Sequence, residues 1–218
     1  MEQESRRLLV EGAKVFGIDL DEKGVEAFEH YRRELLKWSQ KINLTAIRTE
    51  KGIVLKHFLD SLSANPYLSD ASVLLDIGSG AGFPGIPLKM INPGLVVTLI
   101  DSVRKKVDFQ RHVIRTLHLK GIEAIHGRAQ DQEVVQSLGE RFDVVISRAF
   151  SDLSMLLDLS QPLLKKGGKV LAMKGKREGE EISSTAERKC APFRFQKAIT
   201  FILPFSSFER TILLFQKE

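Results

Sequence analysis

The sequence predicts an α/β fold in which a mostly parallel sheet carries helices on both faces. From residue 71 to about residue 173, short apolar segments alternate with amphipathic ones, which is the pattern of successive strand–helix–strand units. The first apolar segment, 73–77, leads into a turn with three glycines at alternate positions. The last two apolar segments are joined by a linker too short to contain a helix, so they must pair as an antiparallel hairpin.

Each element of this fold is placed by its hydrophobic period. Short apolar runs between turn residues are typical of buried strands, whereas apolar residues repeated every three or four positions indicate helices. Glycine, proline and asparagine mark where elements end. The expected parallel strands are 73–77, 96–100, 122–126, 142–147 and 169–173; the hairpin strands are 193–203 and 211–215; and the helices are one ending before 92, then 102–119, 130–138 and 153–164.

The first 66 residues contain helical patterns and no strand pattern. Gly17 ends the first expected helix, Asp21 can cap the second, and Thr49 opens the third. We expect a helical cap at 1–66 packed on the sheet and a Rossmann-like domain at 67–218, together one compact unit. The apolar faces of the three helices are Leu8, Leu9, Ala13 and Phe16; Val25, Phe28, Tyr31, Leu35 and Trp38; and Val54, Leu55, Phe58, Leu59 and Leu62.

Composition narrows the class of protein. The 43% share of hydrophobic residues is ordinary for a globular protein, and a single cysteine, Cys190, excludes an internal disulfide. No apolar run could span a bilayer and no signal peptide is evident, so we expect a soluble cytoplasmic protein. The formal net charge of +5 suits a polyanionic partner. His112 and His118 are not at metal-ligand spacing, so no metal site is expected.

The turn after the first strand is the expected cofactor site, and two kinds of cofactor compete for it. In one frame, Gly80–Gly85 matches the dinucleotide fingerprint, which alone is a weak signal. In the other, Asp76–Gly82 forms the D-x-G-x-G-x-G loop of class I S-adenosylmethionine-dependent methyltransferases. An acid at the strand end and bare backbone amides suit the ammonium and carboxylate of S-adenosylmethionine, whereas Asp76 would repel a pyrophosphate.

A second acid supports the same site. Asp101 ends the second strand, where a carboxylate can accept both ribose hydroxyls of either cofactor. The loop, Asp101 and the antiparallel C-terminal hairpin strand together favour the methyl donor and the class I methyltransferase sheet. The alternatives are a dinucleotide-dependent oxidoreductase, a catalytically silent RNA-binding protein and a purely structural glycine turn.

The residues after the fourth strand indicate which chemical groups could accept a methyl group. Methylation of an exocyclic amine typically uses Asn/Asp-Pro-Pro-aromatic, but the sequence here is Ser147-Arg148-Ala149-Phe150. Methylation of pyrimidine C5 needs a nucleophilic cysteine, and Cys190 lies in the wrong place. A ring nitrogen, a hydroxyl or a carboxylate remains. Arg148 could bond guanine O6 or a phosphate, or it could form a structural salt bridge.

These motifs resemble the ribosomal small-subunit methyltransferase G family (glucose-inhibited division protein B) over nearly the whole chain. The resemblance implies methylation of N7 of a guanine in bacterial 16S rRNA, guanine 527 in that family, with S-adenosylmethionine as donor and S-adenosylhomocysteine as product. The motifs are Lys37-Trp38, Asn43-Leu44-Thr45, His57 with Asp60-Ser61, Asp76–Pro87, Asp101-Ser102 with Lys105-Lys106, Gly127-Arg128-Ala129, Ser147-Arg148-Ala149, Lys174-Gly175 and Glu209-Arg210.

The resemblance also implies roles for residues of this chain. Phe83 would line the donor pocket, Asp101 would hold the ribose, Ala129 and Gln130 would flank the adenine, and Arg148 would close the site as its catalytic, positioning residue without a general base. The family often has an acid where Gln130 stands, and the glutamine carbonyl can accept the same hydrogen bond. The full expected cofactor set is Asp76, Gly78, Ser79, Gly80, Gly82, Phe83, Asp101, Ser102, Ala129, Gln130 and Arg148.

The expected partner is 16S rRNA, alone, in the small ribosomal subunit or in an assembly intermediate, and we expect a monomer. His57 and Asp60 lie within one helical turn and could pair, but docking of this helix onto the glycine loop is the favoured interpretation of His57. The candidate RNA contacts are Asn43, Lys105, Lys106, Arg128, Lys174, Lys176, Arg177 and Arg210.

Overall fold

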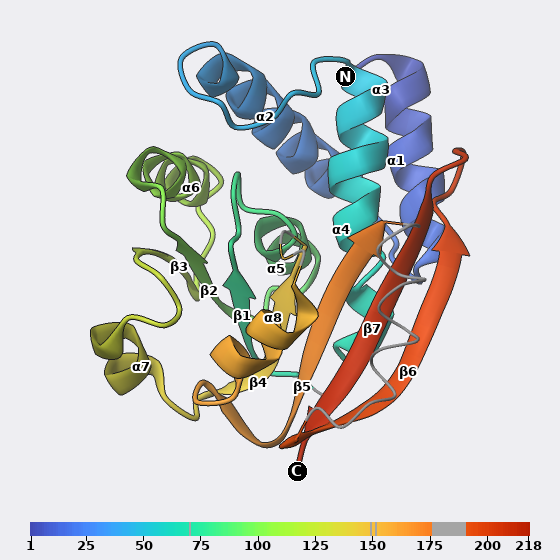
Figure 1. The fold of residues 1–218 in the computed structure, drawn as a ribbon. Coiled ribbons are helices and arrows are strands. Elements are labelled where there is room, and N and C mark those ends of the chain that lie inside the picture. Colours follow the sequence, from blue (N-terminus) through green and yellow to red (C-terminus); the bar gives the residue numbers. More distant parts are fainter. Residues whose placement is uncertain (70, 149, 151, 176–190) are drawn as a thin grey trace.

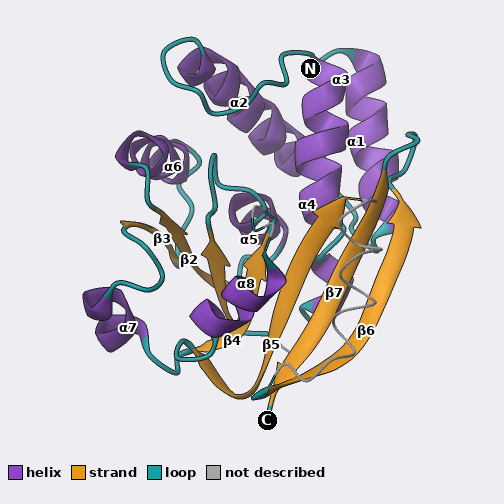
Figure 2. Ribbon diagram, in the orientation of Figure 1, coloured by secondary structure: helices purple, strands orange, loops and turns teal. Residues whose placement is uncertain are grey.

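The structure, a computed structural model, describes residues 1–69, 71–148, 150, 152–175 and 191–218 (Figure 1). Within these residues, one seven-stranded sheet lies between two layers of helices (Figure 2). None of the helices in the described ranges is long and apolar enough to cross a membrane. The seven-stranded sheet with helices on both faces confirms the α/β class expected from the sequence.

The sheet has the strand order β3-β2-β1-β4-β5-β7-β6. The first five strands are parallel, and β7 runs antiparallel between β5 and β6, as the short linker between the last two apolar segments predicted. The strands are β1 (Val73–Ile77), β2 (Val96–Asp101), β3 (Ile122–His126), β4 (Phe142–Ser147), β5 (Leu164–Gly175), β6 (Phe193–Ile202) and β7 (Glu209–Lys217).

Alternation of side chains along the strands divides the interior into two cores. In β1, Leu74 belongs to the core on one face, whereas Leu75 and Ile77 belong to the core on the other. The first core also contains residues of α5 (Gly85–Ile91) and α6 (Arg104–Thr116), and the second contains residues of α7 (Gln132–Leu138) and α8 (Leu153–Ser160). Because both faces are covered there, the central strands β1, β2 and β4 are buried along almost their whole length, whereas the edge strands β3 and β6 also contain exposed residues.

The N-terminal helices share the first core with the sheet. They are α1 (Gln3–Val15), α2 (Glu22–Ser39), α3 (Glu50–Ile53) and α4 (Asp60–Leu62), with a π-helical stretch at Val54–Leu59 that joins α3 to α4. The Asp21 carboxylate accepts from the Gly24 N–H at 2.7 Å, and the Thr49 hydroxyl accepts from the Gly52 N–H at 3.2 Å, so both expected N-caps are present. Figure 1 shows this cap beside the ends toward which the arrows of β1 and β5 point.

Several boundaries differ from the sequence prediction, and those at the two ends of β5 have a physical reason in strand pairing. The helix expected to reach residue 164 ends at Ser160, because Leu164 already pairs with Phe142 of β4 as the first residue of β5. At its other end, β5 continues past Met173 to Gly175 and pairs with β7 as far as Arg210. Local apolar content could not reveal either change, because the pairing partners are distant in the sequence.

Candidate functional site

The glycine turn lies at the carboxyl end of β1 and has a backbone that only glycine adopts readily. Gly78, Gly80 and Gly82 have φ values of 70°, 60° and 92°. Space is a second reason at Gly82, because a Cβ there would lie 2.4 Å from the Ile86 Cδ1 and 2.8 Å from the Tyr31 hydroxyl. At Gly80 the nearest atom to such a Cβ would be 3.9 Å away, so this part of the turn is open.

Asp76 is fully buried beneath this turn and faces the first turn of α5. One carboxylate oxygen, Oδ2, accepts from the Gly85 N–H at 2.8 Å, and the other, Oδ1, has no hydrogen-bond partner among the described residues. Burial raises the pKa of Asp76 to about 7, although the Gly85 N–H and the Arg148 charge act in the opposite direction. Asp76 is thus an acid whose charge depends on what approaches Oδ1.

The amides of the turn are less bare than the sequence suggested. The Gly78 and Ser79 N–H groups donate to the Ile100 carbonyl, and the Gly82 and Phe83 N–H groups donate to the Ser79 carbonyl. The Ala81 N–H, by contrast, donates to no group within the described ranges. One amide of the turn therefore has a hydrogen-bond donor that no described group uses.

Asp101 links the turn to β2. Its Oδ2 accepts from the Gly80 N–H at 2.8 Å and its Oδ1 accepts from the Val103 N–H at 2.8 Å. Each carboxylate oxygen keeps a further lone pair, so Asp101 can still accept from hydroxyl groups of a ligand. The position expected for a ribose contact is therefore compatible with that role.

A pocket of about 220 Å³ adjoins Asp101 and brings together predicted cofactor residues from two parts of the chain. Asp101 and Ser102 come from the end of β2, and Ala129 and Gln130 come from the loop after β3. The sequence indicated no role for the apolar residues that line the rest of this pocket. The remaining lining is Ile77, Ile100, Gly127, Arg128, Phe150, Met155 and Leu159. The position of Phe150 directly after the Ser-Arg-Ala motif was the available signal.

Arg148 lies at the junction of the sheet and the cap. Its Nη1 donates to the Lys56 carbonyl at 3.0 Å and lies 3.3 Å from the Asp60 Oδ2, so the structural salt bridge considered from the sequence is present. The guanidinium carbon lies 5.3 Å from the centroid of the Phe83 ring. The side chain is 23% exposed, and a guanidinium has five N–H donors, so donors remain for a second partner.

His57 docks on the glycine turn, as favoured from the sequence. Its ring stacks on Phe83 with centroids 4.6 Å apart and planes inclined by 7°. Its Nδ1 lies 3.2 Å from an Arg148 nitrogen that can only donate, so Nε2 must carry the hydrogen and donate to the Thr45 hydroxyl at 2.7 Å. Burial and the Arg148 charge lower the pKa of His57 to about 3. This histidine is therefore neutral at physiological pH.

Asp60 does not pair with His57; it connects two arginines instead. Its Oδ1 accepts from the Arg210 Nε at 2.8 Å, while Oδ2 faces Arg148. The Arg210 side chain, a candidate RNA contact, is 21% exposed within this network. The two guanidinium groups and the one carboxylate of this network together carry a net charge of +1.

The other RNA candidates differ in accessibility. Asn43, Lys105 and Arg128 are exposed, and Lys106 is half-buried. The fifth strand was expected to end at Met173, which would place Lys174 just beyond it. This is wrong, because β5 extends to Gly175 and the Lys174 side chain is only 3% exposed. Lys176 and Arg177 lie outside the described residues, as do Ala149 and Cys190.

Two further residues contact the glycine turn and were not predicted as site residues. Tyr31 of α2 and Gln110 of α6 are both buried, and each donates a hydrogen bond to a carbonyl of the turn. From the sequence, Tyr31 was expected on the apolar face of its helix, and the structure confirms this position. The hydroxyl group on an otherwise apolar face was the available sign that Tyr31 has a polar partner. Within the described ranges, no group of three or more histidine, cysteine or acidic residues could hold a metal ion.

Comparison with known proteins gives the family of this chain. It is 40% identical over 213 residues to a ribosomal RNA small subunit methyltransferase G of Acetivibrio thermocellus, covering 97% of this chain and 88% of the relative. It is 43% identical over 219 residues to that of Geotalea uraniireducens, covering 100% of this chain and 99% of the relative.

Solved structures with the same fold include a SAM dependent methyltransferase from Aquifex aeolicus, with a TM-score of 0.54 at 16% identity over 67% of this chain and 82% of that one. Another is the 1,6-didemethyltoxoflavin-N1-methyltransferase of Burkholderia thailandensis with bound S-adenosylhomocysteine, with a TM-score of 0.54 at 15% identity over 72% of this chain and 76% of that one. At these identities the likeness concerns the fold alone. The model of the rRNA small subunit methyltransferase G family matches residues 24–205, and the chain belongs to this family.

Proposed function

We propose that this protein transfers the methyl group of S-adenosylmethionine to N7 of a guanine in 16S rRNA, guanine 527 by analogy with its family. The observation that carries the proposal is the arrangement of Asp101, the pocket beside it and the glycine turn at the carboxyl ends of β1 and β2, with Arg148 beside Phe83 at the rim. Membership of the family supplies the RNA substrate class.

The residues present fit such a donor. The unpartnered Asp76 Oδ1 suits an ammonium, and the free Ala81 N–H suits a carboxylate. Asp101 would accept from the ribose hydroxyls, and the apolar pocket between Ala129 and Phe150 suits an adenine ring. When bound, the donor supplies an electrophilic methyl group on a sulfonium.

The acceptor chemistry needs little from the protein beyond orientation. Guanine N7 carries a lone pair and no proton, so no general base is required, and the neutral His57 with its pKa of about 3 need not act as one. Arg148 would donate to guanine O6, which lies beside N7, and hold the lone pair in line with the methyl–sulfur bond. Its contacts to Asp60, Lys56 and His57 fix the guanidinium in advance.

The test of this function is methyl transfer from labelled S-adenosylmethionine to rRNA of cells that lack this protein. Free 16S rRNA and intact small subunits would be offered separately, and the labelled nucleoside identified by mass spectrometry. We expect 7-methylguanosine at a single position. RNA binding without methyl-donor binding, or label at an exocyclic or ribose position, would contradict the proposal.

Arg148 is tested in the same assay. Arg148→Ala should lower kcat at least about a hundredfold while changing the dissociation constant of the donor little, because orientation of the acceptor is lost. Arg6→Ala is the control, since Arg6 is paired with Glu22 on the surface of the cap. A fully active Arg148→Ala variant would leave Arg148 with a purely structural role.

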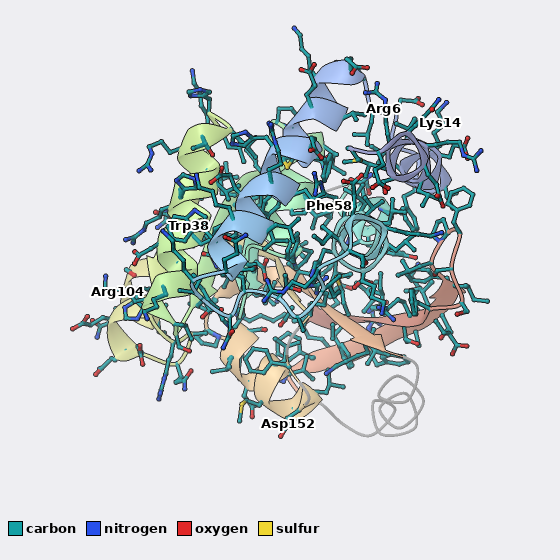
Figure 3. The ribbon with its side chains drawn as sticks, turned by 90° about the horizontal axis from the view of Figure 1, so that it is seen from above. Arg6, Lys14, Trp38, Phe58, Arg104 and Asp152 are labelled. Carbon is teal, nitrogen blue, oxygen red and sulfur yellow. The ribbon has the colours of Figure 1, made fainter. Side chains whose placement is uncertain are left out.

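The exposed basic residues beside the site support RNA as partner. Figure 3 shows Arg104 at the edge of the molecule at the start of α6, and the neighbouring Lys105 is also exposed. Contacts of such residues with phosphates release counterions, so the RNA association constant should fall steeply as salt concentration rises. A flat salt profile would exclude these contacts, and Lys105→Gln should reduce the slope relative to wild type.

A further inference from the structure

Two peptide groups in the middle of the glycine turn are held by side chains from outside it. The first is the Gly80–Ala81 peptide. The Gln110 Nε2 donates to the Gly80 carbonyl at 2.7 Å and to the Ser79 hydroxyl at 2.8 Å. Gln110 is 0% exposed, so solvent cannot replace these bonds.

The orientation of this peptide decides where the free amide points. The carbonyl and the N–H of a trans peptide point in opposite directions. Because Gln110 fixes the Gly80 carbonyl toward α6, the Ala81 N–H of the same peptide points away from α6. This is the amide of the turn that donates to no described group.

The second peptide, Ala81–Gly82, is held from the cap. The hydroxyl of Tyr31 donates to the Ala81 carbonyl at 2.5 Å, and the Gly82 N–H donates to the Ser79 carbonyl at 2.8 Å. Tyr31 is 0% exposed and its ring stacks on Phe83 with centroids 5.2 Å apart and planes inclined by 22°. Burial raises the pKa of Tyr31 well above its usual value of 10.0, so the hydroxyl remains a donor.

We infer that Tyr31 and Gln110 are positioning residues of the cofactor site, which hold two successive peptide planes so that the Ala81 N–H is directed at an anionic group of the ligand. The helical cap is then part of the cofactor site through Tyr31, which acts on the backbone of the turn. The inference rests on the proposed function for the identity of the ligand, the carboxylate of S-adenosylmethionine.

The first measurement is independent of any ligand. Hydrogen exchange of the free protein would be followed at the amides of residues 78–83 in wild type and in the Tyr31→Phe and Gln110→Met variants. We expect exchange in this segment to be at least about fivefold faster in each variant, because a buried carbonyl loses its donor and the turn opens more often. Unchanged exchange in both variants would overturn the inference even if no methyl donor is ever found.

The second measurement is binding of S-adenosylmethionine and S-adenosylhomocysteine by calorimetry. Both ligands carry the carboxylate, so each variant should raise both dissociation constants about fivefold or more, with the RNA dissociation constant unchanged. Dissociation constants within twofold of wild type in both variants would overturn the inference. Failure of the wild type to bind either ligand would instead refute the proposed donor, and the exchange result would still decide the role of the two residues.

Phe28→Leu is the matched control. Phe28 is also a fully buried aromatic residue of α2, but its ring packs on Phe58 at 4.9 Å and it has no hydrogen bond to the turn. This variant should lower the Tm as much as Tyr31→Phe or more, while donor binding stays close to wild type. A loss of donor affinity in Phe28→Leu equal to that in Tyr31→Phe would indicate general loosening of the cap and would refute a specific role for the hydroxyl.

Discussion

At the scale of single residues, the ring of Phe83 joins the glycine turn to the cap. His57 and Tyr31 lie nearly parallel to it, and the guanidinium carbon of Arg148 lies 5.3 Å from its centroid. Burial, together with the positive charge of Arg148, lowers the pKa of His57 to about 3, so this ring is neutral at physiological pH. Beneath the same turn, burial raises the pKa of Asp76 to about 7, close to neutrality.

Asp76→Asn should therefore change how stability depends on pH. The pKa of Asp76 is about 7 in the folded protein and near 3.8 when unfolded, so the folded state holds the proton more tightly. The stability from this protonation is complete below the unfolded pKa and is lost as pH rises through the folded pKa. Asparagine keeps an acceptor for the Gly85 N–H and does not titrate, so the variant should gain on wild type by up to ~1.4 kcal/mol per pH unit between about pH 4 and 7.

Urea unfolding of both proteins at several pH values in the absence of donor measures this difference. Above about pH 8 the two stability curves should run parallel, because Asp76 is then charged in both the folded and the unfolded state. A difference between the two proteins that does not vary with pH would show that Asp76 does not titrate in this range.

At the scale of elements, α5 begins where it does because glycine lets the helix approach β1 and β2. A Cβ on Gly85 would lie 2.3 Å from the Leu99 Cδ2 and 2.9 Å from the Asp76 Oδ2. Leu99 is fully buried. Because Gly85 has no Cβ, the first turn of α5 can pack directly against the Asp76 carboxylate and the glycine turn.

Gly85→Ala should lower the free energy of unfolding by about 1–3 kcal/mol, the usual cost of overpacking a core. Gly94→Ala is the control, because nothing lies within 4 Å of a Cβ at that position, and it should stay within about 0.5 kcal/mol of wild type. Chemical denaturation monitored by circular dichroism measures both. Equal stability of the two variants would mean that α5 can shift to accommodate the methyl group.

At the scale of the whole molecule, the cap and the sheet share one continuous core. Its members include Phe28 and Phe58 of the cap as well as Leu74, Leu99 and Ile146 of the sheet. Trp38 of α2 packs on Phe109 and His112 of α6, with ring centroids 5.6 and 5.1 Å apart, and Figure 3 shows it where α2 and α6 run side by side. Such a core should melt as one unit.

Trp38 provides a test of this cooperativity, because it is the single tryptophan of the chain. Unfolding by urea should give coincident transitions for Trp38 fluorescence, which reports the contact of cap and α6, and for far-ultraviolet circular dichroism, which reports all helices and strands. A fluorescence transition at lower urea would instead mean that the cap separates first and that residues 1–66 form an independent domain.

The amino-acid sequence was sufficient to predict the α/β class, the parallel strands, the C-terminal hairpin and the glycine turn with its two acids. These features depend on hydrophobic period, on backbone conformations that only glycine adopts readily and on linker length, all of which are local properties of the chain. Of the pocket residues, Asp101 could be predicted from its place at the end of a parallel strand, whereas Ser102, Ala129 and Gln130 were predicted through the family resemblance.

The side-chain contacts around the site, by contrast, became known only from the folded arrangement of the chain. Asp60 meets Arg148 across 88 positions and Arg210 across 150, and Tyr31 meets the Ala81 carbonyl across 50. The folded arrangement also places Lys174 inside the sheet rather than on the surface. Period and composition carry no information about partners so far apart, because such contacts arise only when packing of the cap on the sheet fixes the distance between them.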